Sequence, residues 1–237
     1  IPDYVNDTLV LTIKALVNPT YHFKPAELVA VAESMPVFFA PGNGYHYSNT
    51  DYILLGMLIQ KITGNSPITE IQNRIINKLG LMHTYFPPNL PASVVPIFAM
   101  TNGYAYLTGA PDPYAYLDGL HNTTWSSLSI SYTAGGIIST PGDINTYVHA
   151  LFNPGLILNE DEFTGLTNDM VATESSVGFP NGGQPISQVS ESTTEGYGLG
   201  IASLYRHKAP VGKFYLYTGA TIGYTFFYAY FPTLNMY

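Results

Sequence analysis

Residues 39–56 of the chain read FAPGNGYHYSNTDYILLG, a sequence that predicts a loop followed by a helix. It opens as a loop, because proline and glycine favour turns. Asn49 or Thr50 can then cap a helix that runs through Ile62, and Gly64 can end that helix in the left-handed conformation. The body of the helix is apolar nearly all round, which predicts that the helix is buried.

Composition narrows the class of protein. Charged residues make up 10% of the 237 and the net charge is −8, which argues against nucleic acid and an anionic membrane surface as partners. Hydrophobic residues make up 46%, enough for a sizeable core. The chain has no cysteine, which excludes thiolate metal sites, disulfides and a cysteine nucleophile. The six histidines lack the spacing of metal ligands, so neither a metal nor a cofactor is predicted.

Start and stop signals predict helices first and strands later. Ser66-Pro67 and Thr140-Pro141 each place a cap before a proline, and Asn159 is a further cap. Gly80 is expected to end the helix that begins at Pro67. The pattern then changes to that of strands, over residues 196–205, 212–217 and 224–231, and the last of these is an aromatic run typical of a buried strand. This order predicts an α+β chain, or an α/β chain with a separate helical region.

The chemistry is indicated by several segments taken together. The sequence has no Gly-x-Ser-x-Gly, His-Glu-x-x-His, P-loop or dinucleotide-binding glycine motif. The opening stretch instead resembles the serine β-lactamase and penicillin-binding-protein superfamily, in its class C β-lactamase and D-alanyl-D-alanine carboxypeptidase branch. Five more segments resemble that family in the same order: residues 1–4 (IPDY), 75–84 (IINKLGLMHT), 134–143 (AGGIISTPGD), 196–200 (GYGLG) and 217–224 (YTGATIGY).

The resemblance implies a fold and a set of roles. The fold would be β-lactamase/transpeptidase-like, with a helical region over about 5–125 and an antiparallel sheet region over about 126–237. Both regions would form one incomplete domain, residues 1–237, truncated at both ends. Tyr47 would shuttle a proton, Asn49 would hold a lysine and the substrate's amide carbonyl, and the backbone N–H of Ala220 would help form an oxyanion hole. The expected substrate-binding residues are Ser48, Tyr217, Thr218 and Gly219.

The sequence departs from the family pattern in two places. In the family the nucleophile is the serine of a Ser-x-x-Lys motif, and no such motif occurs in these 237 residues. That motif lies upstream of the position of residues 1–4, so the nucleophile is expected outside this chain and the fragment is expected to be inactive. Tyr217 also stands where lysine or histidine is usual. Without that cation, an ester, an amide or a smaller acyl substrate is favoured over a peptidoglycan carboxypeptidase substrate.

These implications predict a serine hydrolase that works through an acyl-enzyme when intact: a β-lactamase, a D-alanyl carboxypeptidase, or a related esterase or amidase. Its partners would be a small-molecule or peptide substrate with an acyl group and the missing N- and C-terminal segments of the same protein. The expected location is periplasmic or secreted.

Other interpretations stay open. Taken alone, Tyr47 and Asn49 also fit a loop aromatic and a helix cap. The substitution at Tyr217 keeps open a non-catalytic relative that binds peptide or cell-wall fragments. A structural or adhesive β protein rests only on the composition rich in tyrosine, asparagine and glycine, and the capped helices argue against it.

Overall fold

A computed structural model describes residues 1–87, 100–173 and 182–237, without the side chains of residues 7–10. The chain divides into two compact units. The first unit comprises Ile1–Pro36, Ser48–Thr140 and Ala220–Thr225, and the second comprises Val37–Tyr47, Pro141–Gly219 and Phe226–Tyr237. The chain therefore passes from one unit to the other between Tyr47 and Ser48, and again between Gly219 and Ala220. The expected single domain with a boundary near residue 125 stays a prediction.

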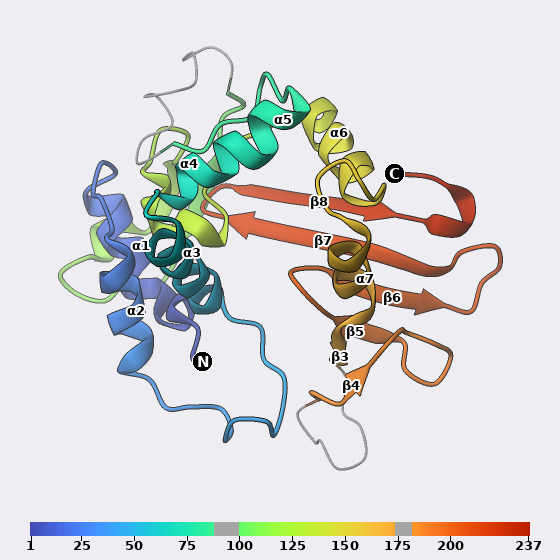
Figure 1. The fold of residues 1–237 in the computed structure, drawn as a ribbon. Coiled ribbons are helices and arrows are strands. Elements are labelled where there is room, and N and C mark those ends of the chain that lie inside the picture. Colours follow the sequence, from blue (N-terminus) through green and yellow to red (C-terminus); the bar gives the residue numbers. More distant parts are fainter. Residues whose placement is uncertain (88–99, 174–181) are drawn as a thin grey trace. The chain divides into compact units, whose positions relative to one another are not determined.

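Over its described residues, the first unit is mainly helical and also contains one small hairpin (Figure 1). Its helices are η1 Tyr4–Asp7, α1 Thr8–Val17, α2 Pro25–Glu33, α3 Asn49–Thr63, α4 Pro67–Ile71, the π-helical η2 Gln72–Ile76, α5 Asn77–Leu79, η4 Ala115–Leu117, η5 Leu128–Ile130 and η6 Tyr132–Ala134. Strands β1 Tyr104–Leu107 and β2 Gly119–Asn122 pair antiparallel, with Tyr106 opposite Leu120.

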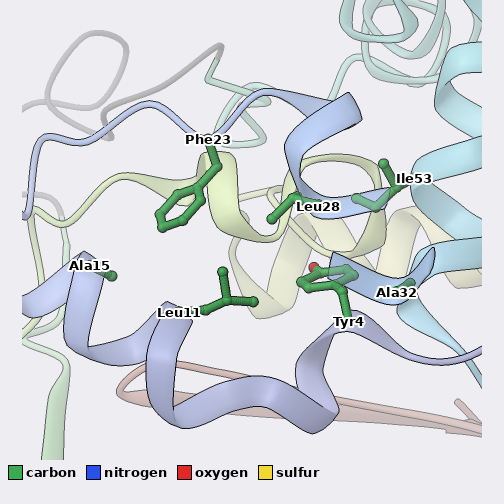
Figure 2. Close-up of a cluster of buried hydrophobic side chains, with 7 residues drawn as sticks. All are labelled: Tyr4, Leu11, Ala15, Phe23, Leu28, Ala32 and Ile53. Carbon is green, nitrogen blue, oxygen red and sulfur yellow. The ribbon is translucent and has the colours of Figure 1, made fainter. Parts of the chain in front are cut away.

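The core of the first unit joins residues that lie far apart in the sequence. Figure 2 shows this cluster, whose members are Tyr4, Leu11, Ala15, Phe23, Leu28, Ala32 and Ile53. Leu28 and Ile53 are completely buried, and each such side chain contributes about 1.5–3 kcal/mol. The hydroxyl of Tyr4 donates to the carbonyl of Ile130 at 2.6 Å, so the one polar group of the cluster is also satisfied. This core fixes α3 against residues 1–4.

Helix α3 follows the expected course but is not fully buried. It ends at Thr63, and Gly64 follows in the left-handed conformation with φ 75°, as the sequence predicts. Ser48 occupies the cap position, one residue earlier than expected. The predicted burial is wrong for one face of the helix, where Leu55, Leu58 and Ile62 are 52%, 48% and 74% exposed. An apolar sequence alone does not show which face of a helix is covered by other segments of the protein.

The second unit is built on a sheet. Its helices are α6 Pro141–Leu151, α7 Glu160–Asn168 and η7 Pro232–Leu234, and its strands are β3 Met170–Ala172, β4 Pro185–Ile186, β5 Glu195–Tyr197, β6 Ala202–Arg206, β7 Gly212–Thr221 and β8 Tyr224–Tyr230. The sheet has the order β4-β3-β5-β6-β7-β8. The pairs from β4 through to β7 are antiparallel, and the adjoining ends of β7 and β8 belong to the first unit.

Helices α6 and α7 lie across one face of this sheet (Figure 1) and close its core around Val148, Leu151, Phe152, Leu166, Ile201 and Tyr215. The predicted helix start at Asn159 is confirmed. The Asn159 side chain accepts from the backbone N–H of Glu162, whose carboxylate accepts from the backbone N–H of Asn159.

Two expectations about the strands need correction. The expected strand over residues 196–205 is a hairpin of β5 and β6, because the chain turns at Gly200 with φ 86°. Strand β8 forms as expected, but its aromatic run is not buried throughout, since Phe226 and Phe227 are 40% and 73% exposed. The α+β class itself is confirmed. In the described parts of the chain, no helix has both the length and the apolar character needed to span a membrane.

Candidate active site

The expected site residues are divided between the two units. Tyr47, Tyr217, Thr218 and Gly219 belong to the second unit, whereas Ser48, Asn49 and Ala220 belong to the first. The family resemblance also predicts that Tyr47, Asn49 and Thr218 converge on one cleft, and this stays a prediction.

The start of α3 is bound to residues 2–4 by a set of buried hydrogen bonds. The hydroxyl of Thr50 donates to the carbonyl of Pro2 at 2.8 Å and accepts from the backbone N–H of Tyr4 at 3.0 Å. The hydroxyl of Ser48 donates to the same carbonyl at 3.2 Å. Ser48 is only 1% exposed, so its hydroxyl is engaged inside the unit, and its contact with a substrate stays a prediction.

Asn49 is held by a carboxylate that the sequence did not single out. Its Nδ2 donates to Oδ2 of Asp3 at 2.9 Å, and Oδ1 of Asp3 accepts from the backbone N–H of Val5 at 3.1 Å. Asp3 is 4% exposed, so both bonds lie in a water-poor region. Asp51, also in the first turn of α3, has a pKa above its ordinary value because of burial and, in part, because of the negative charge of Asp3.

Tyr47 ends a loop of the second unit that is anchored by aromatic rings. Its ring meets that of Tyr197 edge-on at 5.9 Å, and the ring of Tyr45 lies 5.7 Å from the same partner. The ring of His46 stacks on Phe38 at 3.7 Å. Because Tyr197 belongs to β5, these contacts tie the loop that carries Tyr47 to the sheet.

Strand β7 carries the second group of candidate residues at its C-terminal end. The ring of Tyr217 stacks with that of Tyr228 on β8 at 5.7 Å. Desolvation of the partly buried Tyr147 on α6 raises the pKa of its phenol, and the neighbouring Tyr217 raises it further. Thr218 is exposed. A Cβ on Gly219 would meet only the Tyr217 ring, at an ordinary 3.7 Å, so the fold itself does not require glycine there.

Residues 221–224, which follow Ala220, are fixed within the first unit. The hydroxyls of Ser131 and Thr221 lie 3.2 Å apart, and Thr123 donates to the carbonyl of Ile222 at 3.0 Å. The hydroxyl of Tyr224 donates to the carbonyl of Thr101 at 2.8 Å. Ala220 itself is exposed. The segments that flank hairpin β1–β2 thus hold the turn that follows Ala220, whose backbone N–H is the expected oxyanion donor.

The sequence interpretation missed Asp3, although it lies in the IPDY segment that was matched to the family. Asp3 and Asn49 are 46 positions apart in the sequence, which explains why no local pattern pairs them. Among residues 1–87, 100–173 and 182–237, no group of three or more histidine, aspartate or glutamate side chains could hold a metal ion.

The comparisons with known proteins agree with one another. The profile of the family described as Beta-lactamase matches residues 4–236. The unguisins hydrolase ungD of Aspergillus violaceofuscus is 32% identical over 128 residues, which are 54% of this chain and 22% of that protein. A putative D-alanyl-D-alanine carboxypeptidase of Escherichia coli O157:H7 is 26% identical over 173 residues, which are 68% of this chain and 39% of that protein.

Solved structures add a likeness of fold. A D-stereospecific amidohydrolase from Streptomyces sp. matches with a TM-score of 0.77 and 26% identity, over 98% of this chain and 61% of that chain. A D-amino acid amidase from Ochrobactrum anthropi SV3, solved with D-phenylalanine, matches with a TM-score of 0.54 and 27% identity, over 81% of this chain and 56% of that chain. The chain therefore spans less than two thirds of each of these relatives.

Proposed function

Because this chain belongs to the beta-lactamase family, as the resemblance in its sequence predicted, we propose that it is part of a serine hydrolase that works through an acyl-enzyme. The observation that carries the proposal is the Tyr47-x-Asn49 pair at the start of α3, inside a family match that runs over residues 4–236. The nucleophile of this proposal is a serine outside the 237 residues, because a Ser-x-x-Lys motif does not occur among them.

The candidate residues have complementary chemistry. Tyr47 carries a phenol that can take a proton from the nucleophile and pass it to the leaving group. Asn49 offers both an acceptor and a donor, which suits it to orient a lysine and a substrate carbonyl. The backbone N–H of Ala220 can donate to the oxyanion that forms when the acyl group is attacked. Gly219 leaves room beside the strand for the substrate, since the fold does not need a glycine there.

The proposed substrate is an uncharged amide or ester, with an amide of a D-amino acid as the first candidate. Tyr217 stands where the family usually has lysine or histidine, and a tyrosine offers no cation to bind a free substrate carboxylate. The names of two structural relatives, a D-stereospecific amidohydrolase and a D-amino acid amidase, support the same class. A location outside the cytoplasm is part of the proposal, and fractionation of cells that make the intact protein tests it.

The nucleophile is tested by labelling. The intact protein should form a stoichiometric adduct with a fluorophosphonate on a serine outside residues 1–237, and the 237-residue chain alone should form none. Intact mass and peptide mapping distinguish these outcomes. An adduct on Ser48, or on any other serine of the chain, would contradict this placement of the nucleophile.

The role of Tyr217 is tested by restoring a cation. In the intact protein, Tyr217→His should raise the turnover of a carboxylate-bearing β-lactam or D-alanyl peptide relative to a neutral ester, because an imidazolium can pair with the carboxylate. Tyr217→Phe is the matched control, since it keeps the stacked ring but adds no charge. A rate ratio that moves equally in both variants would show that Tyr217 does not face the substrate.

The second candidate function is a non-catalytic receptor for peptide or cell-wall fragments, which the loss of the cation at position 217 favours. An intact protein that binds D-phenylalanine amide without hydrolysing it, and that forms no adduct, would select the receptor over the enzyme.

A further inference from the structure

Asp3 is a buried carboxylate in direct contact with a candidate catalytic residue. It is 4% exposed, and its two oxygens are used separately, Oδ1 by the backbone N–H of Val5 and Oδ2 by Nδ2 of Asn49. Burial of a charge is costly unless hydrogen bonds compensate for it. The Asn49 amide therefore supplies one of the bonds that make a buried Asp3 tolerable, and the two side chains constrain each other.

The contact fixes which end of the Asn49 amide faces Asp3. Both oxygens of Asp3 accept hydrogen bonds, one from Val5 and one from Asn49, so the end of the Asn49 amide that faces Asp3 is the NH₂ and not the carbonyl. The reverse orientation of the amide would bring its carbonyl oxygen against a carboxylate oxygen that accepts, which is unfavourable. The Oδ1 atom must then point away from Asp3. Over the described residues, no hydrogen-bond donor reaches that oxygen.

We propose that Asp3 is a positioning residue for Asn49, which it holds with the NH₂ inward so that Oδ1 is presented to a donor in the reaction, such as an ammonium group or a substrate N–H. The proposal rests on the proposed function. It assigns to the segment before η1 a role in the chemistry, beyond its packing in the core of the first unit.

A structural role and a positioning role can be separated at this residue. Asp3 also caps η1 through the backbone N–H of Val5. Asparagine is an equally good cap, so Asp3→Asn retains that bond. The same substitution turns an NH₂ toward Asn49, which must rotate its amide by half a turn to meet it. The polarity of the inner contact is thereby reversed while the shape of both side chains is kept.

The experiment uses the intact protein and three variants: Asp3→Asn, Asn49→Asp, and both together. In Asp3→Asn, kcat for an ester or amide substrate should fall about 10- to 100-fold with a smaller change in KM and a nearly unchanged Tm, because the wrong end of Asn49 faces the reaction. An unchanged kcat in this variant would overturn the proposal.

The double variant supplies the control for lost contacts. In Asn49→Asp two carboxylates face each other, whereas in the double variant the amide at position 3 donates to the carboxylate at position 49 and leaves the second oxygen facing outward. The double variant should be at least about tenfold more active than Asn49→Asp alone, a rescue that follows from restored polarity. Both proteins lack the Asn49 amide, so equal activities would count against positioning by Asp3.

Failure of the enzyme proposal is distinguishable from failure of this inference. If the intact protein hydrolyses no ester or amide, the orientation can still be followed in the NMR signals of the Asn49 side-chain amide. One of its two protons should be protected from exchange in the native protein and should lose that protection in Asp3→Asn. Signals that do not respond to Asp3→Asn would overturn the inference whatever the activity.

Discussion

At the scale of single residues, Thr50 is the polar group on which the start of α3 depends. It is fully buried, and its hydroxyl both donates to Pro2 and accepts from Tyr4. Thr50→Val has the same shape but leaves the backbone N–H of Tyr4 without its partner and the Pro2 carbonyl with only the longer bond from Ser48, so the free energy of unfolding should fall by about 1–3 kcal/mol. Thr50→Ser keeps both bonds and is the matched control. Urea unfolding measures both, and equal losses would show that packing, rather than hydrogen bonding, decides this position.

Tyr215 gives the fold a sensitivity to high pH. Burial raises its pKa from the ordinary 10 to about 12. A tyrosine whose pKa is higher in the folded than in the unfolded protein contributes its full stabilisation below the pKa of the unfolded state. That stabilisation is lost as the pH rises through the pKa of the folded state. The protein should therefore lose stability between about pH 10 and 12, and Tyr215→Phe should move the alkaline unfolding midpoint upward.

Circular dichroism across this pH range measures the midpoint. Tyr116→Phe is the control, because the Tyr116 ring is 70% exposed. An equal shift in both variants would assign the effect to net charge instead of to burial of Tyr215.

At the level of secondary-structure elements, Gly103 allows hairpin β1–β2 to pack against the β7–β8 hairpin. Gly103 directly precedes β1 and lies against the ring of Tyr224, the first residue of β8. A Cβ at this position would lie 2.3 Å from the Tyr224 ring, a separation that real contacts do not show. Gly103→Ala should therefore lower the Tm and release the bond from Tyr224 to Thr101, because ring or backbone must shift.

The same substitution in helix α7 supplies the control. A Cβ on Gly165 would meet its nearest atoms at 3.4 and 3.8 Å, and alanine favours a helix over glycine by about 1 kcal/mol, so Gly165→Ala should raise the Tm. Thermal unfolding of the two variants should move in opposite directions. A harmless Gly103→Ala would mean that the turn carrying Ala220 is not held by the hairpin.

At the scale of the whole molecule, the exposed face of α3 should govern how the isolated chain behaves. Leu55, Leu58 and Ile62 follow one another along one side of the helix, and all three are about half exposed or more. Contiguous apolar surface of this kind promotes association. The 237-residue chain should self-associate as its concentration rises, and Leu58→Glu with Ile62→Lys should reduce that association.

Sedimentation velocity measures the association. Met82→Glu is the control, because Met82 is 76% exposed but lies outside α3. Association that responds equally to both sets of substitutions would show that α3 is not the contact surface.

Features that depend on a few neighbouring residues could be predicted from the sequence. Ser66 caps α4 by accepting from the backbone N–H of Thr69, and Gly64 and Gly80 end their helices in the left-handed conformation, all as their positions predict. Such signals act over a single helical turn, so neighbouring residues are enough to specify them. The family is also legible in the sequence, because several short motifs occur in a fixed order.

Contacts between distant segments of the chain could not be predicted in this way. Asp3 and Asn49 are 46 residues apart, and nothing local pairs a carboxylate with that amide. The exposure of one face of α3 and of the aromatic rings on β8 could likewise not be predicted from the sequence. The hydrophobic effect has no direction, so an apolar residue does not specify which surface will cover it. Burial and partner are properties of the packed chain, and they are set by contacts between segments that the sequence separates.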